Sequence, residues 1–163
     1  MSANLEAKKQ VVEDIKARIQ ASKSVVLVDY KGMTVAEDTA LRNKFRASNV
    51  FYKVYKNTLM KRAFNELGID AFDSDLNNTT SVAFAEDEVS AAKIVVDTVK
   101  ELNDKISVKS GWVDGAYMDD KGIKALASIP SKEGLYAMLA GTLQGFISGF
   151  ARAIKAVADS KAE

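Results

Sequence analysis

The sequence predicts an α+β fold, and two patterns carry that prediction. Four short segments have the composition and alternation of strands, and segments of helical periodicity separate them. The first and third strands are almost wholly apolar, as strands covered on both faces are, whereas the second and fourth alternate. Strands one and three therefore belong at the centre of a four-stranded sheet. This is the arrangement of a ferredoxin-like split βαβ domain, here with extra helices and a protruding C-terminal helix.

Ten elements are expected along the chain. The helices are expected over about residues 1–20, 34–47, 58–67, 86–102, 120–127 and from 131 onward, and the strands over 24–30, 50–56, 80–85 and 106–117. The first helix has one apolar face, formed by Leu5, Val12, Ile15 and Ile19. The first strand is a continuous apolar run that ends before Gly32.

Local signals mark the elements that follow. Thr34 with Glu37 is typical of a capping box at the start of the second helix. The second strand passes over Asn57 into the third helix, and residues 70–78 form a polar, acidic connection. The acidic residues 86–88 are expected in the first turn of the fourth helix, because negative charge stabilises that end of the helix dipole.

Composition excludes several classes of function. The chain of 163 residues is 47% hydrophobic and 28% charged, which suits a globular domain with a substantial core. It contains no cysteine and no histidine, so it lacks disulfides, thiolate sites and the commonest general base and metal ligand. It also lacks the glycine-rich phosphate-binding spacings and the nucleophile-elbow spacing. We therefore expect no enzyme, no cofactor, no metal and no small-molecule substrate.

Two further expectations concern single features. Asp29 at the end of the first strand is the only candidate catalytic acid, and a turn hydrogen bond ahead of Gly32 explains it better. The first residues contain no apolar segment of the signal-peptide kind, so a cytoplasmic protein is expected.

Charge is unevenly distributed, although the net charge is only +1. Residues 1–62 contain 13 basic and 6 acidic residues, residues 63–104 contain 2 and 10, and residues 105–163 contain 8 and 6. A basic first third is the electrostatic footprint of a nucleic-acid binder. The acidic middle segment keeps the rest of the surface away from phosphate.

The junction between the second strand and the third helix is the most informative segment. Lys53, Lys56, Lys61 and Arg62 cluster around it. Because the first N–H groups of a helix are unpaired and partly positive, the junction suits an anion such as a phosphate backbone. Asn57 either caps the helix or turns its amide towards RNA. The alternative, on composition alone, is a solvated strand end with scattered lysines.

The C-terminal segment contains 17 consecutive uncharged residues, from 135 to 151. A membrane span needs about 20 mostly apolar residues, so this shorter run with three glycines predicts no membrane contact. A helix packed inside the domain would leave the apolar residues beyond it uncovered. We favour a helix that offers an apolar stripe to partner helices. The stripe consists of Leu143, Phe146, Ile147, Phe150, Ile154 and Val157.

Three motifs carry a resemblance to a known family. Residues 25–34 read Val-Val-Leu-Val-Asp-Tyr-Lys-Gly-Met-Thr, Leu41 precedes Arg42, and Lys56-Asn57-Thr58-Leu59 is followed by Lys61, Arg62 and Ala63. With these motifs the whole chain resembles the bacterial large-ribosomal-subunit protein ten family, the base of the ribosomal stalk. Residues 131–158 look like the docking helix of that family. Some relatives extend this helix to hold more partner dimers, whereas here it ends at Glu163.

The resemblance implies a structural protein of the large ribosomal subunit in the cytoplasm. Residues 1–130 are expected to bind large-subunit rRNA near the factor-binding centre, and residues 131–163 to hold dimers of the acidic stalk protein, which recruit translational GTPases. Neighbouring large-subunit proteins at the stalk base are further expected partners. Family members bound to the stalk protein can also repress their own mRNA. From the length of the helix, we expect room for about two dimers per chain.

The expected rRNA-binding residues come from two sources. The resemblance carries over Lys31, Lys56, Asn57, Thr58 and Arg62. Charge and placement alone add Lys8, Lys9, Arg42, Arg46, Lys53 and Lys61.

Two other binding proteins remain as alternatives. A ribosome-assembly factor of the same fold could bind the same rRNA site, but would lack the docking helix. A four-stranded RNA-recognition module needs an aromatic motif in its third strand, which the segment 79–85 does not contain.

Overall fold

The computed structural model describes residues 3–102 and 106–161, except for the side chains of residues 3–5, 70 and 160–161. The predicted position of Leu5 in the apolar face therefore lies outside the described side chains. The chain divides into two units, Met1–Ile129 and Pro130–Glu163.

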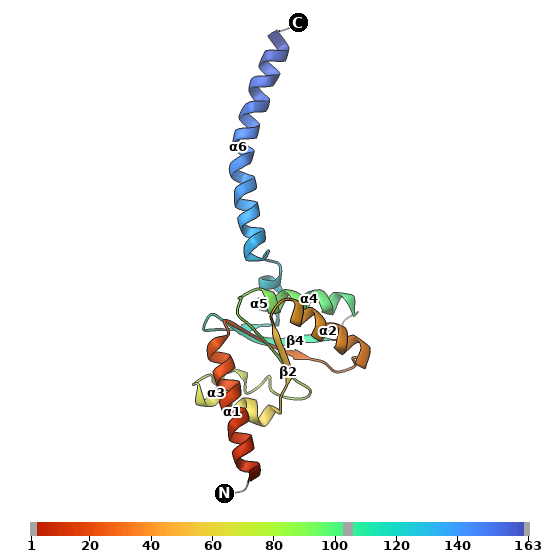
Figure 1. Ribbon diagram of the computed structural model, residues 1–163, viewed down its shortest axis with the longest axis vertical. Helices are drawn as coiled ribbons and strands as arrows, with labels where there is room; N and C mark the ends of the chain where they lie inside the picture. Colours follow the sequence, from red (N-terminus) through yellow and green to blue (C-terminus); the bar gives the residue numbers. More distant parts are fainter. Residues whose placement is uncertain (1–2, 103–105, 162–163) are drawn as a thin grey trace. The chain divides into compact units, whose positions relative to one another are not determined.

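The first unit is built on a five-stranded antiparallel sheet with helices on both faces (Figure 1). Its strands are β1 (Ser24–Asp29), β2 (Phe51–Val54), β3 (Ser81–Ala85), β4 (Ser107–Val113) and β5 (Ala116–Asp119). They lie in the order β2-β3-β1-β4-β5, and each neighbouring pair is antiparallel. The prediction that the first and third strands are central is confirmed.

Helices cover the two faces of the sheet as separate layers (Figure 1). One layer contains α1 (Ala3–Ala21), α3 (Asn57–Glu66) and the 3₁₀-helix η1 (Asp70–Phe72). The other contains α2 (Val35–Ala47), α4 (Ser90–Glu101) and α5 (Asp120–Ala127). Because successive strand residues face opposite sides, Val25 of β1 belongs to the first core and Val26 to the second.

The start of α2 follows the sequence prediction. The hydroxyl of Thr34 accepts a hydrogen bond from the backbone N–H of Glu37, and the Glu37 carboxylate accepts one from the backbone N–H of Thr34 at 2.7 Å. This reciprocal pair is the predicted capping box, and it satisfies two N–H groups at the helix start. The same helix buries Leu41 and Phe45 in the core.

The prediction of a single fourth strand over 106–117 was wrong, because this segment forms the hairpin β4–β5. Asp114 and Gly115 have positive φ angles of 50° and 85°, and Val113 pairs with Ala116. A two-residue turn with both φ angles positive is the connection that an Asp-Gly dipeptide favours. The sheet therefore has five strands instead of four.

The predicted start of the fourth helix was also wrong, because α4 begins at Ser90. The hydroxyl of Ser24 on β1 donates to the backbone oxygen of Asp87 at 2.6 Å, and the hydroxyl of Ser90 donates to the Asp87 carboxylate at 3.2 Å. These bonds accompany a non-helical path through residues 86–89, so the acidic residues precede the first turn of α4.

The acidic connection at 70–78 contributes to the core, which its composition did not indicate. Phe72 and Leu76 are both buried, and the Phe72 ring lies 4.7 Å from that of Phe64 and 6.3 Å from that of Trp112, measured between centroids. Because η1 brings Phe72 inward, the segment closes the α1/α3 side of the sheet.

The second unit consists of α6 (Lys132–Lys161), drawn in Figure 1 as one continuous helix. Its start matches the prediction, since the chain turns at Pro130 and the helix begins two residues later. Among the described residues, no helix combines the length and the apolar content needed to cross a bilayer.

Replacing Phe72 by Ala should destabilise the first unit by about 3 to 5 kcal/mol, because it opens a cavity among packed aromatic rings. Denaturant unfolding followed by the fluorescence of Trp112, the only tryptophan, measures this loss. Phe146→Ala is the matched control, since Phe146 is 81% exposed on α6. Equal unfolding midpoints for the two variants would contradict this description of the core.

Candidate functional site

A hollow lies where β1 and β2 end and α3 begins, and we call it the junction hollow. It is lined by Tyr30, Lys31, Val54, Tyr55, Lys56, Asn57, Asn78, Thr79 and Thr80. Three residues predicted to bind rRNA, Lys31, Lys56 and Asn57, therefore line one site although they come from two parts of the sequence. Within the described part of the chain, the ammonium groups of Lys31 and Lys56 have no carboxylate partner.

Asn57 holds one wall of the junction hollow. Its side-chain nitrogen Nδ2 donates to the backbone oxygen of Asn78 at 2.7 Å. The N-cap of α3 is Lys56, which makes no capping hydrogen bond with its side chain. The interpretation of Asn57 as a helix cap was therefore wrong. Its side-chain nitrogen is committed to Asn78, and the start of α3 remains without a side-chain cap.

Asp29 fixes the same wall from the end of β1. Its carboxylate accepts a hydrogen bond from the hydroxyl of Thr79 and another from the backbone N–H of Lys31 at 3.1 Å. The second bond is the predicted turn hydrogen bond, which is confirmed. Asp29 thus joins the turn that carries Lys31 to the wall formed by Asn78 and Thr79.

Two lysines anchor the loop of residues 73–80, which forms that wall. Lys109 of β4 donates through Nζ to the hydroxyl of Thr80 at 2.8 Å and also to the backbone oxygens of Asp75, at 3.4 Å, and Asn77. Lys61 donates to the backbone oxygen of Asp73 at 2.7 Å, and its Nζ lies 3.7 Å from the Asp73 carboxylate. Lys61, a predicted rRNA contact, therefore has a role in holding this loop.

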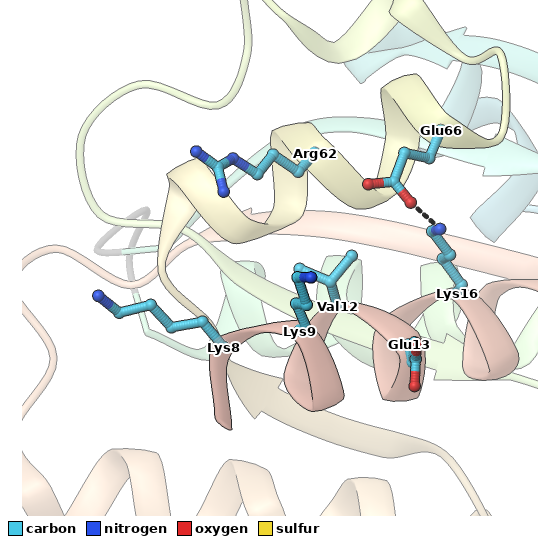
Figure 2. A pocket seen from close by; sticks show the side chains of 7 residues that line it. All are labelled: Lys8, Lys9, Val12, Glu13, Lys16, Arg62 and Glu66. Atoms are coloured by element: carbon cyan, nitrogen blue, oxygen red, sulfur yellow. Dashed lines mark hydrogen bonds and ion pairs between the residues drawn. The ribbon is translucent and has the colours of Figure 1, made fainter. Parts of the chain in front are cut away.

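A second group of cations lies between α1 and α3, in a groove that we call the α1/α3 groove (Figure 2). Figure 2 shows Lys8 of α1 and Arg62 of α3 extending towards the same end of the groove, with Lys9 further along α1, beside Val12. At the other end, Lys16 and Glu66 form an ion pair. Within the described residues, Lys8, Lys9 and Arg62 have no ion-pair partner, so their charges are available to an external anion.

The remaining predicted residues do not join these two sites. Arg42 and Arg46 lie on α2, in the helix layer across the sheet from α1 and α3, where they line a small hollow with Tyr52. Arg42 is paired with Asp38, with 2.9 Å between the Arg42 nitrogen Nε and the nearer carboxylate oxygen. The predicted basic set therefore does not form one continuous surface.

Lys53 and Thr58 complete the predicted set and lie close to the junction in the sequence. The ammonium nitrogen of Lys53 on β2 lies 5.0 Å from the centre of the Tyr55 ring. Thr58 is exposed in the first turn of α3. Neither side chain is among those lining the two sites.

Sequence reasoning missed the aromatic and polar lining of the junction hollow, notably Tyr30 and Tyr55. Burial raises the pKa of the Tyr55 hydroxyl, and the charge of Arg18 offsets part of that rise. Lys109 was also missed, because its partners lie 29 to 34 residues earlier and no local pattern separates it from a solvated lysine. Among the described residues, no carboxylate cluster is arranged to hold a metal ion.

The apolar stripe on α6 is exposed along its length. Phe146 is 81% and Phe150 70% exposed, and the other predicted members, Leu143, Ile147, Ile154 and Val157, are exposed as well. Thr142, Gly145, Phe146, Gly149 and Phe150 surround a shallow apolar hollow on the helix. The apolar turns upstream of the stripe, which also belong to the uncharged run 135–151, are exposed as well, at Leu135, Tyr136, Met138 and Leu139.

Comparison with known sequences places this two-unit chain among the ribosomal proteins. The family described as Ribosomal protein L10 matches residues 3–100. The family described as Ribosomal protein uL10 C-terminal region matches residues 129–163. The two matches together cover most of the first unit and the whole of the second.

Individual relatives agree with these matches over almost their full length. The chain is 44% identical over 163 residues to the large ribosomal subunit protein uL10 of Shouchella clausii, covering 100% of this chain and 98% of the relative. The Staphylococcus carnosus protein of the same name is 43% identical over 164 residues, with coverages of 100% and 98%. That of Finegoldia magna is 42% identical over 159 residues, with coverages of 98% and 88%.

The chain therefore belongs to the uL10 family of large-ribosomal-subunit proteins. As a member of this family it is a structural protein of the ribosome in the cytoplasm and not an enzyme.

Asn57→Ala should destabilise the first unit by about 0.5 to 1.5 kcal/mol, because the variant loses the hydrogen bond to the backbone oxygen of Asn78. Thermal or denaturant unfolding measures the change. Asn65→Ala, at an exposed position on the same helix, is the matched control and should leave the unfolding free energy almost unchanged. If Asn57→Ala is as stable as this control, Asn57 does not hold the loop.

Proposed function

We propose that this protein forms the base of the large-subunit stalk. The unit Met1–Ile129 binds large-subunit rRNA, and α6 holds dimers of the acidic stalk protein, which support the recruitment of translational GTPases. Neighbouring large-subunit proteins complete its surroundings at the stalk base. The family membership supports this role, and the geometry of the two cationic sites and of the α6 stripe supplies its physical basis.

One observation carries the rRNA-binding part of this proposal. The junction hollow and the α1/α3 groove are both built on α3, which contributes Asn57 to the first site and Arg62 to the second. These two residues are separated by about 7.5 Å along a helix that rises 1.5 Å per residue. Unpaired lysines at the first site, and unpaired lysines together with Arg62 at the second, favour phosphate, because charge-assisted hydrogen bonds form and bound counterions are released.

Helices α4 and α5, on the other face of the sheet, do not compete for RNA in the same way. Lys100 forms an ion pair with Asp97 on α4, and Lys124 forms one with Asp120 on α5. The segment 86–101, which leads into and forms α4, contains five acidic and only two basic residues. We therefore assign RNA binding to the α1/α3 side.

The exposed stripe of α6 supports the second part of the proposal. A continuous row of apolar side chains on a helix favours a protein partner, because burying it removes apolar surface from water. Arg152 and Lys155 lie off the stripe on the same helix and complement an acidic partner. Leu135 to Val157 spans about 33 Å, and a docked helical pair covers about 20 Å, so we expect about two dimers per chain.

The assembly-factor alternative is less well supported. It binds the same rRNA site but has no use for a docking helix, whereas residues 129–163 match the uL10 C-terminal region. The exposed stripe of α6 favours a stalk protein for the same reason.

Lys56→Ala and Arg62→Ala should each weaken binding to large-subunit rRNA by about 1 to 3 kcal/mol, because each removes a charge-assisted contact. Each should also lower the slope of log affinity against log salt concentration by about one phosphate equivalent. Filter binding or fluorescence anisotropy at several salt concentrations measures both quantities. Lys100→Ala on α4 is the control with the same charge loss. A Lys56/Arg62 double variant that binds like this control would exclude the proposed surface.

Phe150→Asp should remove most binding of the acidic stalk protein, because it places an unpaired carboxylate in an apolar interface at a cost of several kcal/mol. Co-purification or calorimetry with the stalk protein tests this. Ser148→Asp adds the same charge off the stripe on the same helix, so it is the matched control and should retain the partner. Equal retention by both variants would contradict docking on the stripe.

The number of bound dimers is a separate prediction, which native mass spectrometry of the co-expressed complex measures. Two dimers per chain follow from the length of the apolar surface. If three dimers bind, the contact extends outside residues 135–157. If no stalk protein binds, the docking role of α6 is refuted.

A further inference from the structure

We infer that the junction hollow is a binding site for a single unstacked nucleotide of the bound RNA, with the base inside the hollow and the phosphate at its lysines. This inference rests on the proposed rRNA binding and adds the chemical class of the ligand at one site. It assigns Tyr30, Tyr55, Asn78 and Thr79 to RNA recognition, beyond the basic residues already discussed.

The lining of the hollow has the three kinds of group that an unstacked nucleotide needs. Tyr30 and Tyr55 are among the residues that line the hollow, and an aromatic ring is a surface on which a base stacks. Of the two, Tyr55 also packs against the α1/α3 core, and its ring centre lies 5.0 Å from the Lys53 ammonium. Lys31 and Lys56 supply positive charge for the adjoining phosphate. A bare phosphate site would not need the tyrosines, and an apolar peptide site would not place two unpaired lysines at its wall.

Hydrogen-bonding groups for the edge of a base remain available in the wall. Asn57 uses only its Nδ2 group, on the backbone oxygen of Asn78, so its side-chain oxygen is an unused acceptor among the described residues. The side-chain amide of Asn78 likewise has no hydrogen-bond partner among them. The side chain of Asn57 thus offers an acceptor, and the side chain of Asn78 offers both a donor and an acceptor.

The wall that carries these groups is fixed before any ligand arrives. Asn78 has a positive φ of 59°, a conformation that asparagine tolerates better than most residues. Hydrogen bonds from Asn57, Lys109 and Thr79 hold the loop 73–80 to α3, β4 and β1. A preformed wall lowers the entropy that binding must overcome.

The size of the hollow suits one nucleotide and not a helix. Its volume is about 450 Å³, within the range of about 300 to 1,000 Å³ for small-ligand sites. A base enters such a site only when it is unstacked and unpaired, as in RNA loops and bulges. The junction hollow should therefore recognise a single-stranded feature, whereas the α1/α3 groove contacts the backbone.

The test compares Tyr30→Ala, Tyr30→Phe and wild type on two RNAs, large-subunit rRNA and a fully paired duplex, at several salt concentrations. On rRNA, Tyr30→Ala should bind about 10-fold or more weakly, and Tyr30→Phe should bind within about twofold of wild type because it keeps the ring. The salt slope of both variants should stay at the wild-type value, since no cation is removed. On the duplex, which offers no free base, the three proteins should bind alike.

Tyr136→Ala is the matched control for the loss of a tyrosine, because Tyr136 is exposed on α6. Ultraviolet cross-linking of the wild-type complex, followed by mass spectrometry, gives a second measurement that needs no variant to fold. It should place a nucleotide adduct on Tyr30 or Tyr55.

The possible outcomes separate this inference from the function on which it rests. Wild-type protein that fails to bind rRNA would refute the proposed rRNA binding itself. Normal rRNA binding by Tyr30→Ala, with no adduct on either tyrosine, would overturn the nucleotide site alone. If Tyr30→Ala loses the same affinity for rRNA and for the duplex, the hollow binds the RNA backbone, and the nucleotide site is overturned as well. If Tyr30→Ala binds RNA normally but binds a neighbouring ribosomal protein more weakly, the hollow is a protein contact instead, and the nucleotide site is overturned.

Discussion

Strand β1 is buried on both faces, and the two cores of the first unit both depend on it. Val25 and Leu27 pack into the layer of α1 and α3, and Val26 and Val28 pack into the layer of α2, α4 and α5. A strand in this position needs partners at both edges, and β3 and β4 supply them. Because β1 ends at Asp29, the residue that closes the central strand also binds the wall of the junction hollow.

This arrangement separates the residues that build the site from those that are free to bind. Asp29, Asn57, Lys61 and Lys109 use their polar groups on the loop 73–80 and its neighbours. Lys31 and Lys56 line the same hollow without a carboxylate partner in the described part of the chain. Buried or anchored polar groups thus fix the geometry, and the exposed cations retain their charge for phosphate.

The sequence predicted the parts of the fold that local patterns encode. The apolar runs placed β1 and β3 at the centre, and the Thr34–Glu37 pair located the start of α2. The β4–β5 turn was encoded in Asp114-Gly115, but the alternation around it resembled one strand. The roles of Asn57 and Lys109 could not be predicted, because their partners lie 21 to 34 residues away and are acceptors on a loop without periodicity. Nor could charge alone show that the sheet separates Arg42 and Arg46 from Lys8, Lys9 and Arg62.

The central claim is that RNA binds on the α1/α3 side of the sheet, at sites built on α3. Hydrogen–deuterium exchange of the protein with and without large-subunit rRNA tests it most directly, because it reports every backbone segment of the unmodified chain at once. If RNA binds there, exchange should slow in the first turns of α3, in the N-terminal part of α1 and in residues 77–80, while α4 and α5 stay unchanged. Protection confined to α2, α4 or α5, with α3 unaffected, would contradict it.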